Sequence, residues 1–157
     1  MHEYIISLGS NQGDRLTLLA SALEKLTDAG CMVDATSRII ETAPWGFTDQ
    51  ADFLNQAVQV RGVFDPRAML SLCQKIEKEL GRERDIKWGP RTLDMDIIAW
   101  NGGVYDRGGL EIPHPRMHQR LFVLLPMEEI QPDWVHPIRL QTIEELIEQL
   151  QQNENKQ

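Results

Sequence analysis

Two aspartates lie one residue apart in the chain, at Asp94 and Asp96. Residues 93–100 carry apolar side chains at alternate positions, which predicts a β-strand, and the Gly89-Pro90 pair before them predicts a loop. Side chains two positions apart on a strand share a face, so the two carboxylates lie about 7 Å apart at about 3.3 Å per residue. Because neighbouring carboxylates repel each other, a hard cation bound between them is the simplest relief. The pair is therefore a candidate metal site.

The alternative for this pair is the solvated face of an edge strand. However, Ile98 and Trp100 share the face of the aspartates, so this face is not uniformly polar. Cationic residues also precede the aspartates closely, at Arg82, Arg84, Lys87 and Arg91. Mixed charge of this kind is usually a solvated loop, but beside a metal it suits a clamp for a triphosphate.

The composition is that of one globular domain. The chain has 157 residues, of which 41% are hydrophobic and 25% are charged, and this fits a single domain over residues 1–157. The formal net charge of −8 argues against a general nucleic-acid-binding protein, which needs a basic surface. Residues 151–157 are polar and are expected to fray.

The sequence also bears on cellular location. No apolar run approaches the roughly 18 residues of a membrane span, and the chain begins with a strand rather than a signal peptide. Cys31 and Cys73 are isolated from other ligand-type residues, which favours buried free thiols over a disulfide. We therefore expect a cytoplasmic protein that binds neither nucleic acid nor membrane, and we expect it to be a monomer.

Hydrophobic periodicity predicts the order strand, helix, strand, strand, helix, strand for the chain up to Trp100. The expected elements are a strand at 4–8, a helix with a stripe of Leu16, Leu19, Leu23 and Leu26, strands at 32–42 and 53–63, a helix from Asp65 that Gly81 ends, and a strand at 93–100. This order is that of a ferredoxin-like α+β fold, a βαββαβ antiparallel sheet with both helices on one face.

The C-terminal third is expected to add a hairpin over residues 104–112 and two helices. One of these begins near Arg120, and the other begins at the capping box of Thr142 and Glu145. The two earlier helices should cover the apolar face of the last strand of the sheet. The aspartates would then lie on the opposite face, under a roof built by the C-terminal third.

Further features are candidates for ligand binding. Phe53 and Asn55 share a strand face, and a ring beside an amide suits a flat heterocycle. Trp45 in the loop 43–52 either contacts a ligand or folds onto the core. His114 lies between two prolines and is either an exposed turn residue or a ligand-binding residue. The glycine-rich turn after the first strand lacks the phosphate-loop patterns, so we interpret it as a turn.

Several of these motifs occur together in a known order. They are Leu8-Gly9-Ser10-Asn11, Thr42 with Pro44 and Gly46, Phe53-Leu54-Asn55, the segment Trp-Gly-Pro-Arg-Thr-Leu-Asp-Met-Asp-Ile at 88–97, and Ile112-Pro113-His114 followed by Arg120. Over nearly the whole chain they resemble the 6-hydroxymethyl-7,8-dihydropterin pyrophosphokinase family, and the Gly-Pro-Arg-x-x-Asp-x-Asp segment is the most diagnostic. The resemblance implies a ferredoxin-like fold and a role in folate biosynthesis. In that reaction the pyrophosphate of MgATP passes to the pterin hydroxymethyl group, giving AMP and the pterin diphosphate.

The resemblance also implies which residues form the site. The catalytic residues would be Arg82, Arg91, Asp94 and Asp96, with two Mg²⁺ ions held by the two aspartates. ATP would be bound by Gln74, Glu77, Arg84, Trp88, Arg91, Ile97, His114 and Arg120. The pterin would be bound by Thr42, Ala43, Trp45, Phe53, Asn55 and Phe122. Phe53 stands where tyrosine is common in the family, so a packing contact is retained without the hydroxyl.

Two other classes of protein are alternatives. A nucleotidyltransferase or cyclase on a similar fold needs a nucleic-acid path or a second nucleotide pocket, and the acidic charge together with Trp45, Asn55 and Phe122 argues against it. A non-catalytic ligand-binding module would not need both aspartates with four cations nearby. No Ser-His-Asp or Cys-His nucleophilic set is evident in the sequence, and phosphoryl-type transfer by metals and arginines does not require one.

Overall fold

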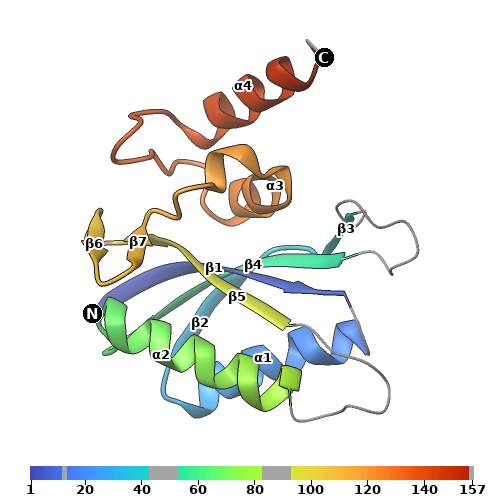
Figure 1. Cartoon of the computed structure of the whole chain (residues 1–157), viewed down its shortest axis with the longest axis vertical. Helices are drawn as coiled ribbons and strands as arrows, with labels where there is room; N and C mark the ends of the chain where they lie inside the picture. The colour runs from blue at the N-terminus through green and yellow to red at the C-terminus, as the bar shows by residue number, and fades with distance from the viewer. Residues whose placement is uncertain (12–13, 43–52, 83–92, 156–157) are drawn as a thin grey trace.

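The chain is organised around an antiparallel sheet (Figure 1). The structure, a computed structural model, describes residues 1–11, 14–42, 53–82 and 93–155. The strands of the sheet are β1 (His2–Ser10), β2 (Met32–Thr36), β3 (Ile40–Thr42), β4 (Phe53–Gly62) and β5 (Leu93–Trp100). Their order is β2-β4-β1-β5, β3 also pairs with β4, and every neighbouring pair is antiparallel. The last strand, β5, has the bounds that the sequence predicts.

Two helices, α1 (Arg15–Asp28) and α2 (Pro66–Glu77), cover one face of the sheet, and a π-helical turn, η1 (Lys78–Arg82), follows α2 (Figure 1). The Asp65 carboxylate caps α2 by accepting the N–H of Ala68 at 2.9 Å. Apolar residues of both helices and the sheet form one core, which includes Leu19, Leu26, Met69, Cys73, Ile76, Leu93, Met95 and Ile97. This core buries the apolar face of β5, so the aspartates point away from α1 and α2.

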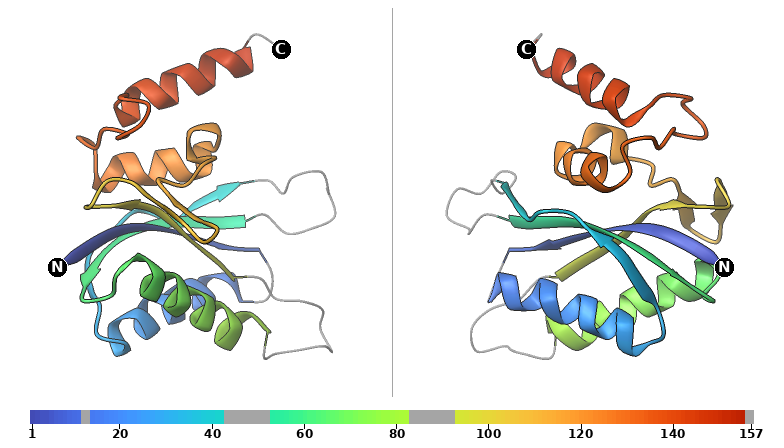
Figure 2. Two further views of the ribbon diagram at one scale, coloured as in Figure 1. Left: turned by 60° about the vertical axis from the view of Figure 1, so that its left-hand side comes forward. Right: turned by 180° about the vertical axis from the view of Figure 1, so that it is seen from behind.

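The C-terminal third covers part of the opposite face. It contains the hairpin of β6 (Tyr105–Arg107) and β7 (Leu110–Ile112), the 3₁₀ turn η2 (Met117–Gln119), α3 (Leu121–Ile130) and α4 (Ile143–Asn155). The views in Figure 2 place α3 between the sheet and α4. A second core joins Met117, Val123, Leu124, Met127, Ile143 and Leu146 to the sheet residues Ile5, Ile98 and Ala99. These sheet residues lie toward the end of β5 that is remote from Asp94, so this core leaves the Asp94 end of the face open.

Residues 32–42 differ from the single strand that the sequence predicts. They form two strands, β2 and β3, with a break between them. Ser37 accounts for the break, because its N–H donates to the carbonyl of Ala57 at 2.8 Å and its hydroxyl accepts the N–H of Ala57 at 2.9 Å. Ser37 thus occupies both the N–H and the carbonyl of Ala57 in β4. The chain pairs with β4 again from Ile40.

Three local expectations also differ from the structure. Leu16 is 60% exposed, because the buried stripe of α1 runs through Leu18, Leu19, Ala22 and Leu26 instead. Gly81 lies inside the π-helical turn rather than beyond the end of the helix. Helix α4 continues to Asn155, past the point at residue 151 where fraying is expected.

The prediction of free, buried thiols is confirmed. Cys31 and Cys73 are free and buried, and burial raises the pKa of the Cys73 thiol to about 12. A thiol with such a pKa is protonated at neutral pH and chemically inert. In the described part of the chain, none of the helices is both long enough and apolar enough to span a bilayer.

Helix α4 begins at the expected capping box. The N–H of Thr142 donates to Glu145 Oε1 at 2.9 Å, and the N–H of Glu145 donates to Thr142 Oγ1 at 3.1 Å. We expect Thr142→Ala to lower the free energy of unfolding by about 1 kcal/mol, because one N-terminal N–H loses its acceptor. Urea denaturation measures this change. The exposed Gln151→Ala in the same helix is the control and should stay within about 0.5 kcal/mol of wild type; equal effects of the two variants would contradict the prediction.

Candidate active site

A cleft of about 450 Å³ lies on the open face of the sheet. Residues of four strands line it, namely Ser7 and Gly9 on β1, Thr42 on β3, Phe53 and Asn55 on β4, and Asp94 and Asp96 on β5. The segment after β7 adds Arg116, Gln119, Arg120 and Phe122. The cleft therefore combines two carboxylates, two guanidinium groups, two carboxamides and two phenyl rings.

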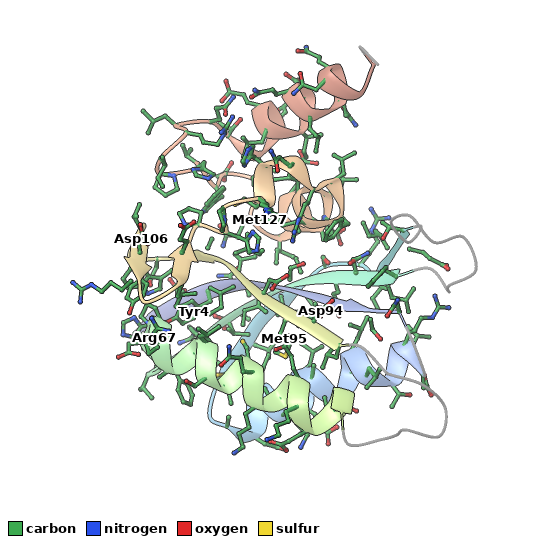
Figure 3. The ribbon with its side chains drawn as sticks, viewed as in Figure 1. Tyr4, Arg67, Asp94, Met95, Asp106 and Met127 are labelled. Carbon is green, nitrogen blue, oxygen red and sulfur yellow. The ribbon has the colours of Figure 1, made fainter. Side chains whose placement is uncertain are left out.

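Strand register explains why these side chains meet. Gly9 lies opposite Asn55 on one side and opposite Asp94 on the other, and Ser7 lies opposite Asp96. Figure 3 shows Asp94 and Met95 on opposite sides of β5. Since alternate residues share a face, one row of the sheet carries the Asn55 amide and the Asp94 carboxylate, with only a glycine between them.

The two aspartates form the acidic part of the cleft. Asp94 is exposed as a residue, but partial withdrawal of its carboxyl from solvent raises the pKa of this group, the charge of Asp96 acts in the same direction, and Arg120 partly opposes them. Among the described residues, neither aspartate forms an ion pair, and no group of three His, Cys, Asp or Glu side chains is arranged to hold a metal. Two carboxylates are a partial ligand set of the kind that Mg²⁺ takes when it also binds phosphate and water, so the aspartates are candidate ligands.

The segment that carries Arg116 and Arg120 is the cationic part of the cleft, and His114 joins it to β5 by hydrogen bonds. The N–H of His114 donates to the carbonyl of Ile98 at 3.0 Å, and His114 Nδ1 accepts the N–H of Arg116 at 3.1 Å. Burial lowers the pKa of His114, although the charge of Asp96 opposes this shift. The ring is therefore held in its neutral form with Nε2 carrying the proton. Arg120 lies over the ring of Phe122, with its guanidinium carbon 5.7 Å from the ring centre.

The amide part of the cleft is also fixed. Asn55 is 3% exposed, and its Nδ2 donates to Thr42 Oγ1 at 2.8 Å. With the amide nitrogen engaged at Thr42, Oδ1 is directed toward Gly9, where a Cβ atom would lie 3.3 Å from it. The site thus offers a fixed hydrogen-bond acceptor beside Phe53, in a place kept open by glycine.

The structure brings together seven of the residues that the sequence predicts for the site. These are Thr42, Phe53, Asn55, Asp94, Asp96, Arg120 and Phe122. Ala43, Trp45, Arg84, Trp88 and Arg91 lie outside the described residues, as does Lys87. Arg82 belongs to η1, but its side chain is not described.

Four predicted ATP-binding residues do not line the cleft. Gln74 is exposed on α2, and Ile97 is 5% exposed in the core on the helix side of the sheet. Glu77 Oε2 accepts the N–H of Met95 at 2.8 Å, so this carboxylate supports the edge of β5 between the two aspartates. His114 does not line the cleft, but it bonds to Ile98 of β5 and to the N–H of Arg116. Their role in binding ATP stays a prediction.

The sequence prediction missed four residues of the cleft, Ser7, Gly9, Arg116 and Gln119. Strand alternation puts Asp94 and Asp96 on one face from the sequence alone. Ser7 and Gly9 are found beside them only when the register between β1 and β5 is known. Arg116 and Gln119 carry no pattern of their own, because their position depends on how the chain folds back after β7.

Comparison with known proteins identifies the family. A model of the family described as 7,8-dihydro-6-hydroxymethylpterin-pyrophosphokinase (HPPK) matches residues 5–132. The chain belongs to this family. A relative from Bacillus subtilis, named 2-amino-4-hydroxy-6-hydroxymethyldihydropteridine pyrophosphokinase, is 49% identical over 126 residues, which are 80% of this chain and 75% of the relative. An Aquifex aeolicus relative of the same name is 36% identical over 140 residues, covering 89% of this chain and 87% of the relative.

Solved structures agree at the level of the fold. The HPPK-DHPS structure in complex with substrates superimposes with a TM-score of 0.73 at 14% identity, over 93% of this chain and 44% of that chain. A Plasmodium falciparum HPPK-DHPS structure gives a TM-score of 0.72 at 16% identity, over 95% of this chain and 43% of that chain. The present chain thus spans less than half of the length of those proteins, and the similarity extends over nearly all of it.

Proposed function

We propose that the cleft is the active site in which this HPPK-family chain transfers pyrophosphate from MgATP to the hydroxymethyl group of 6-hydroxymethyl-7,8-dihydropterin. The reaction yields AMP and the pterin diphosphate and belongs to folate biosynthesis. The observation that carries the proposal is that one cleft combines the Asp94–Asp96 pair with the ring and amide set of Phe53, Asn55 and Phe122. The first set suits a metal-bound phosphate, and the second suits a flat heterocycle.

The aspartates are the proposed metal ligands. Two carboxylates on one strand face fit a divalent cation with oxygen preference, and partial desolvation together with the charge of Asp96 raises the pKa of Asp94. We propose that they hold two Mg²⁺ ions. When bound, Mg²⁺ offsets the negative charge of the phosphates during transfer. Glu77 would keep the strand between the two aspartates in place through its bond to the N–H of Met95.

The other predicted site residues would bind and orient the two substrates. The pterin would pack against Phe53 and Phe122 and donate a hydrogen bond to Asn55, in a site bordered by Thr42, Ala43 and Trp45. Arg82, Arg84, Arg91, His114 and Arg120 would contact or organise the phosphates, with Gln74, Glu77, Trp88 and Ile97 near the nucleotide. The hydroxymethyl oxygen attacks the β-phosphorus of ATP, the bond from that phosphorus to the α-phosphate oxygen breaks, and the hydroxyl proton is released. Positioning and charge neutralisation supply most of such catalysis.

We also propose the fold type, the domain organisation and the location of the chain. The strand order, the antiparallel pairing and the two helices on one face support a ferredoxin-like fold for residues 1–157 as one domain. The free buried thiols of Cys31 and Cys73 support a cytoplasmic location. A monomeric state that binds neither nucleic acid nor membrane stays a prediction from the sequence.

Product analysis tests the reaction. We expect the protein to form AMP when it is incubated with ATP, Mg²⁺ and the hydroxymethyl dihydropterin, with one AMP released for each pterin diphosphate. ADP as the product would indicate single phosphoryl transfer, and pyrophosphate would indicate a nucleotidyltransferase or cyclase. Absence of any turnover would favour a ligand-binding module. Each of these results would contradict the proposal.

Gly9 provides a prediction about the pterin part of the cleft. A methyl group at position 9 would meet Asn55 Oδ1 at 3.3 Å and occupy the space between the Asn55 amide and Asp94. We expect Gly9→Ala to raise the KM for the pterin by at least about 10-fold, in line with the cost of one misplaced methyl group in a pocket. The KM for ATP should change much less. Steady-state kinetics with each substrate varied separately measures the two constants.

Gly62→Ala is the matched control. Gly62 also lies in a strand of the main sheet, but a Cβ there would meet its nearest atom, the Cα of Cys31, at an ordinary 3.7 Å. This variant should keep both KM values. An unchanged pterin KM in a folded Gly9→Ala protein would show that the space above Gly9 is not used by the pterin.

A further inference from the structure

Arg116 lines the cleft but carries no role in the function described so far. It lies on the same short segment as Gln119 and Arg120, and all three line the cleft that contains Asp94 and Asp96. We propose that Arg116 is a further phosphate-binding residue of this site, which holds the ATP phosphates together with Arg120. The proposal rests on the proposed function, because it assumes that a nucleotide phosphate occupies the cleft.

The backbone that carries Arg116 is fixed on both sides. Its N–H donates to His114 Nδ1 at 3.1 Å, and its carbonyl accepts the N–H of Gln119 at 3.0 Å. His114 is bonded in turn to the carbonyl of Ile98, the residue two positions after Asp96 on β5. The next residue, Met117, is fully buried in the second core. The base of the Arg116 side chain is therefore held relative to the aspartates by hydrogen bonds and by core packing.

The charges in the cleft are not paired with each other in the described part of the chain, and Arg116 is exposed there. Elsewhere in the described chain, arginines pair with carboxylates, such as Arg61 with Asp34 at 2.8 Å and Arg38 with Glu129 at 3.2 Å. Within the same described ranges, neither Arg116 nor Arg120 forms an ion pair, although both line a cleft with Asp94 and Asp96. Acids and arginines that share a cleft without pairing leave room for a group that binds both.

A metal-bound phosphate chain is such a group. Its metal ion is attracted to the aspartates, and its free oxygens are attracted to guanidinium groups, which bind phosphate through two parallel N–H donors. Two arginines on one fixed segment can hold successive phosphates or one phosphate from two sides. Arg120 also lies over Phe122, at the pterin side of the cleft, so Arg116 adds a phosphate contact that is free of the pterin contacts.

Substitution of Arg116 tests the proposal through binding as well as turnover. We expect Arg116→Gln to raise the KM for ATP and the dissociation constant of MgATP, measured by calorimetry without pterin, by about 10-fold each, the effect of losing one charged hydrogen bond. The KM for the pterin should stay within about 2-fold of wild type. Arg116→Lys retains the charge and should recover part of the loss. Because the bond to His114 uses the backbone of residue 116, both variants keep the structural contact.

Arg139→Gln is the matched control, because Arg139 is exposed on the connection between α3 and α4 and does not line the cleft. It removes the same charge and should bind MgATP as wild type does. Equal MgATP affinity in Arg116→Gln and wild type, or an equal loss in Arg139→Gln, would overturn the proposal. The proposed function fails separately if the wild-type protein forms no AMP, and the calorimetric result for Arg116 remains decisive in that case.

Discussion

Replacing Asp96 with asparagine is expected to lower the rate of AMP formation by at least about 10³-fold, because a neutral amide is a much weaker ligand for Mg²⁺ than a carboxylate. Asp96 is half-buried, shares a strand face with Asp94 and lies opposite Ser7 of β1. Asparagine has the same shape as aspartate, so the strand pairing and the cleft should be retained. The loss should therefore appear in kcat with MgATP and pterin both saturating.

Asp133→Asn is the control for Asp96→Asn. Asp133 is exposed on the connection between α3 and α4 and is absent from the cleft, so the same change of charge there should leave the rate unchanged. Circular dichroism and thermal unfolding establish that both variants are folded. Near-normal AMP formation by folded Asp96→Asn would reject the assignment of the aspartates as metal ligands.

The parts of this site that the sequence predicts are those encoded by local patterns. Alternation specifies which side chains share a face over residues 93–98, and it needs no knowledge of the neighbouring strands. It fails beyond Ile98, because the pairing with β1 shifts register there, which places Ala99 in the second core and packs Trp100 against the first. The caps of α2 and α4 are equally local, since Asp65 and Thr142 act on N–H groups three residues away. The residues Phe53 and Asn55 fall on one face for the same reason. These predictions are confirmed because the deciding interactions lie within a few residues of each other.

The missed residues depend on contacts between distant parts of the chain. Gly9 is important only because β1 lies between β4 and β5 in a register that places it beside Asn55 and Asp94. Arg116 reaches the cleft because His114 is bonded to Ile98 of β5 and Met117 is buried under α3 and α4. Such pairings are set by the packing of the whole domain, and the local patterns of one sequence do not specify them.

Glu77 has a structural contact that its motif does not predict. The family resemblance places it near ATP, which stays a prediction, and the structure shows its carboxylate accepting the N–H of Met95 at the edge of β5. An acid close to the candidate metal site can thus act on the backbone that carries Asp94 and Asp96. Spacing on helix α2 alone does not distinguish a residue that touches the nucleotide from one that orients Asp94 and Asp96.

The second large effect is expected at Asp94, where activity and stability should change in opposite directions. Asp94→Asn should lower AMP formation by at least about 10²-fold, because the site loses one carboxylate ligand. In the absence of Mg²⁺ at pH 7, however, the same variant should unfold at a higher temperature than wild type. The reason is that withdrawal from solvent and the charge of Asp96 both disfavour ionised Asp94 in the folded state.

The raised pKa of Asp94 determines how the stability difference between Asp94→Asn and wild type changes with pH. The pKa of Asp94 is raised above its ordinary value of 3.8, so the folded protein binds a proton at this site more readily than the unfolded chain does. Ionised Asp94 therefore destabilises the fold increasingly as the pH rises from 3.8 through the folded-state pKa, and the penalty disappears below 3.8. The stability difference between Asp94→Asn and wild type should accordingly shrink as the pH is lowered toward that value.

Mg²⁺ should reverse the order of the two stabilities at pH 7, because a cation that binds only the folded wild-type site stabilises it. Thermal unfolding with and without Mg²⁺ measures both effects, with Asp133→Asn as the charge-matched control. A wild-type protein that is more stable than Asp94→Asn without Mg²⁺ at pH 7 would mean that the charge of Asp94 is not disfavoured by its place in the cleft.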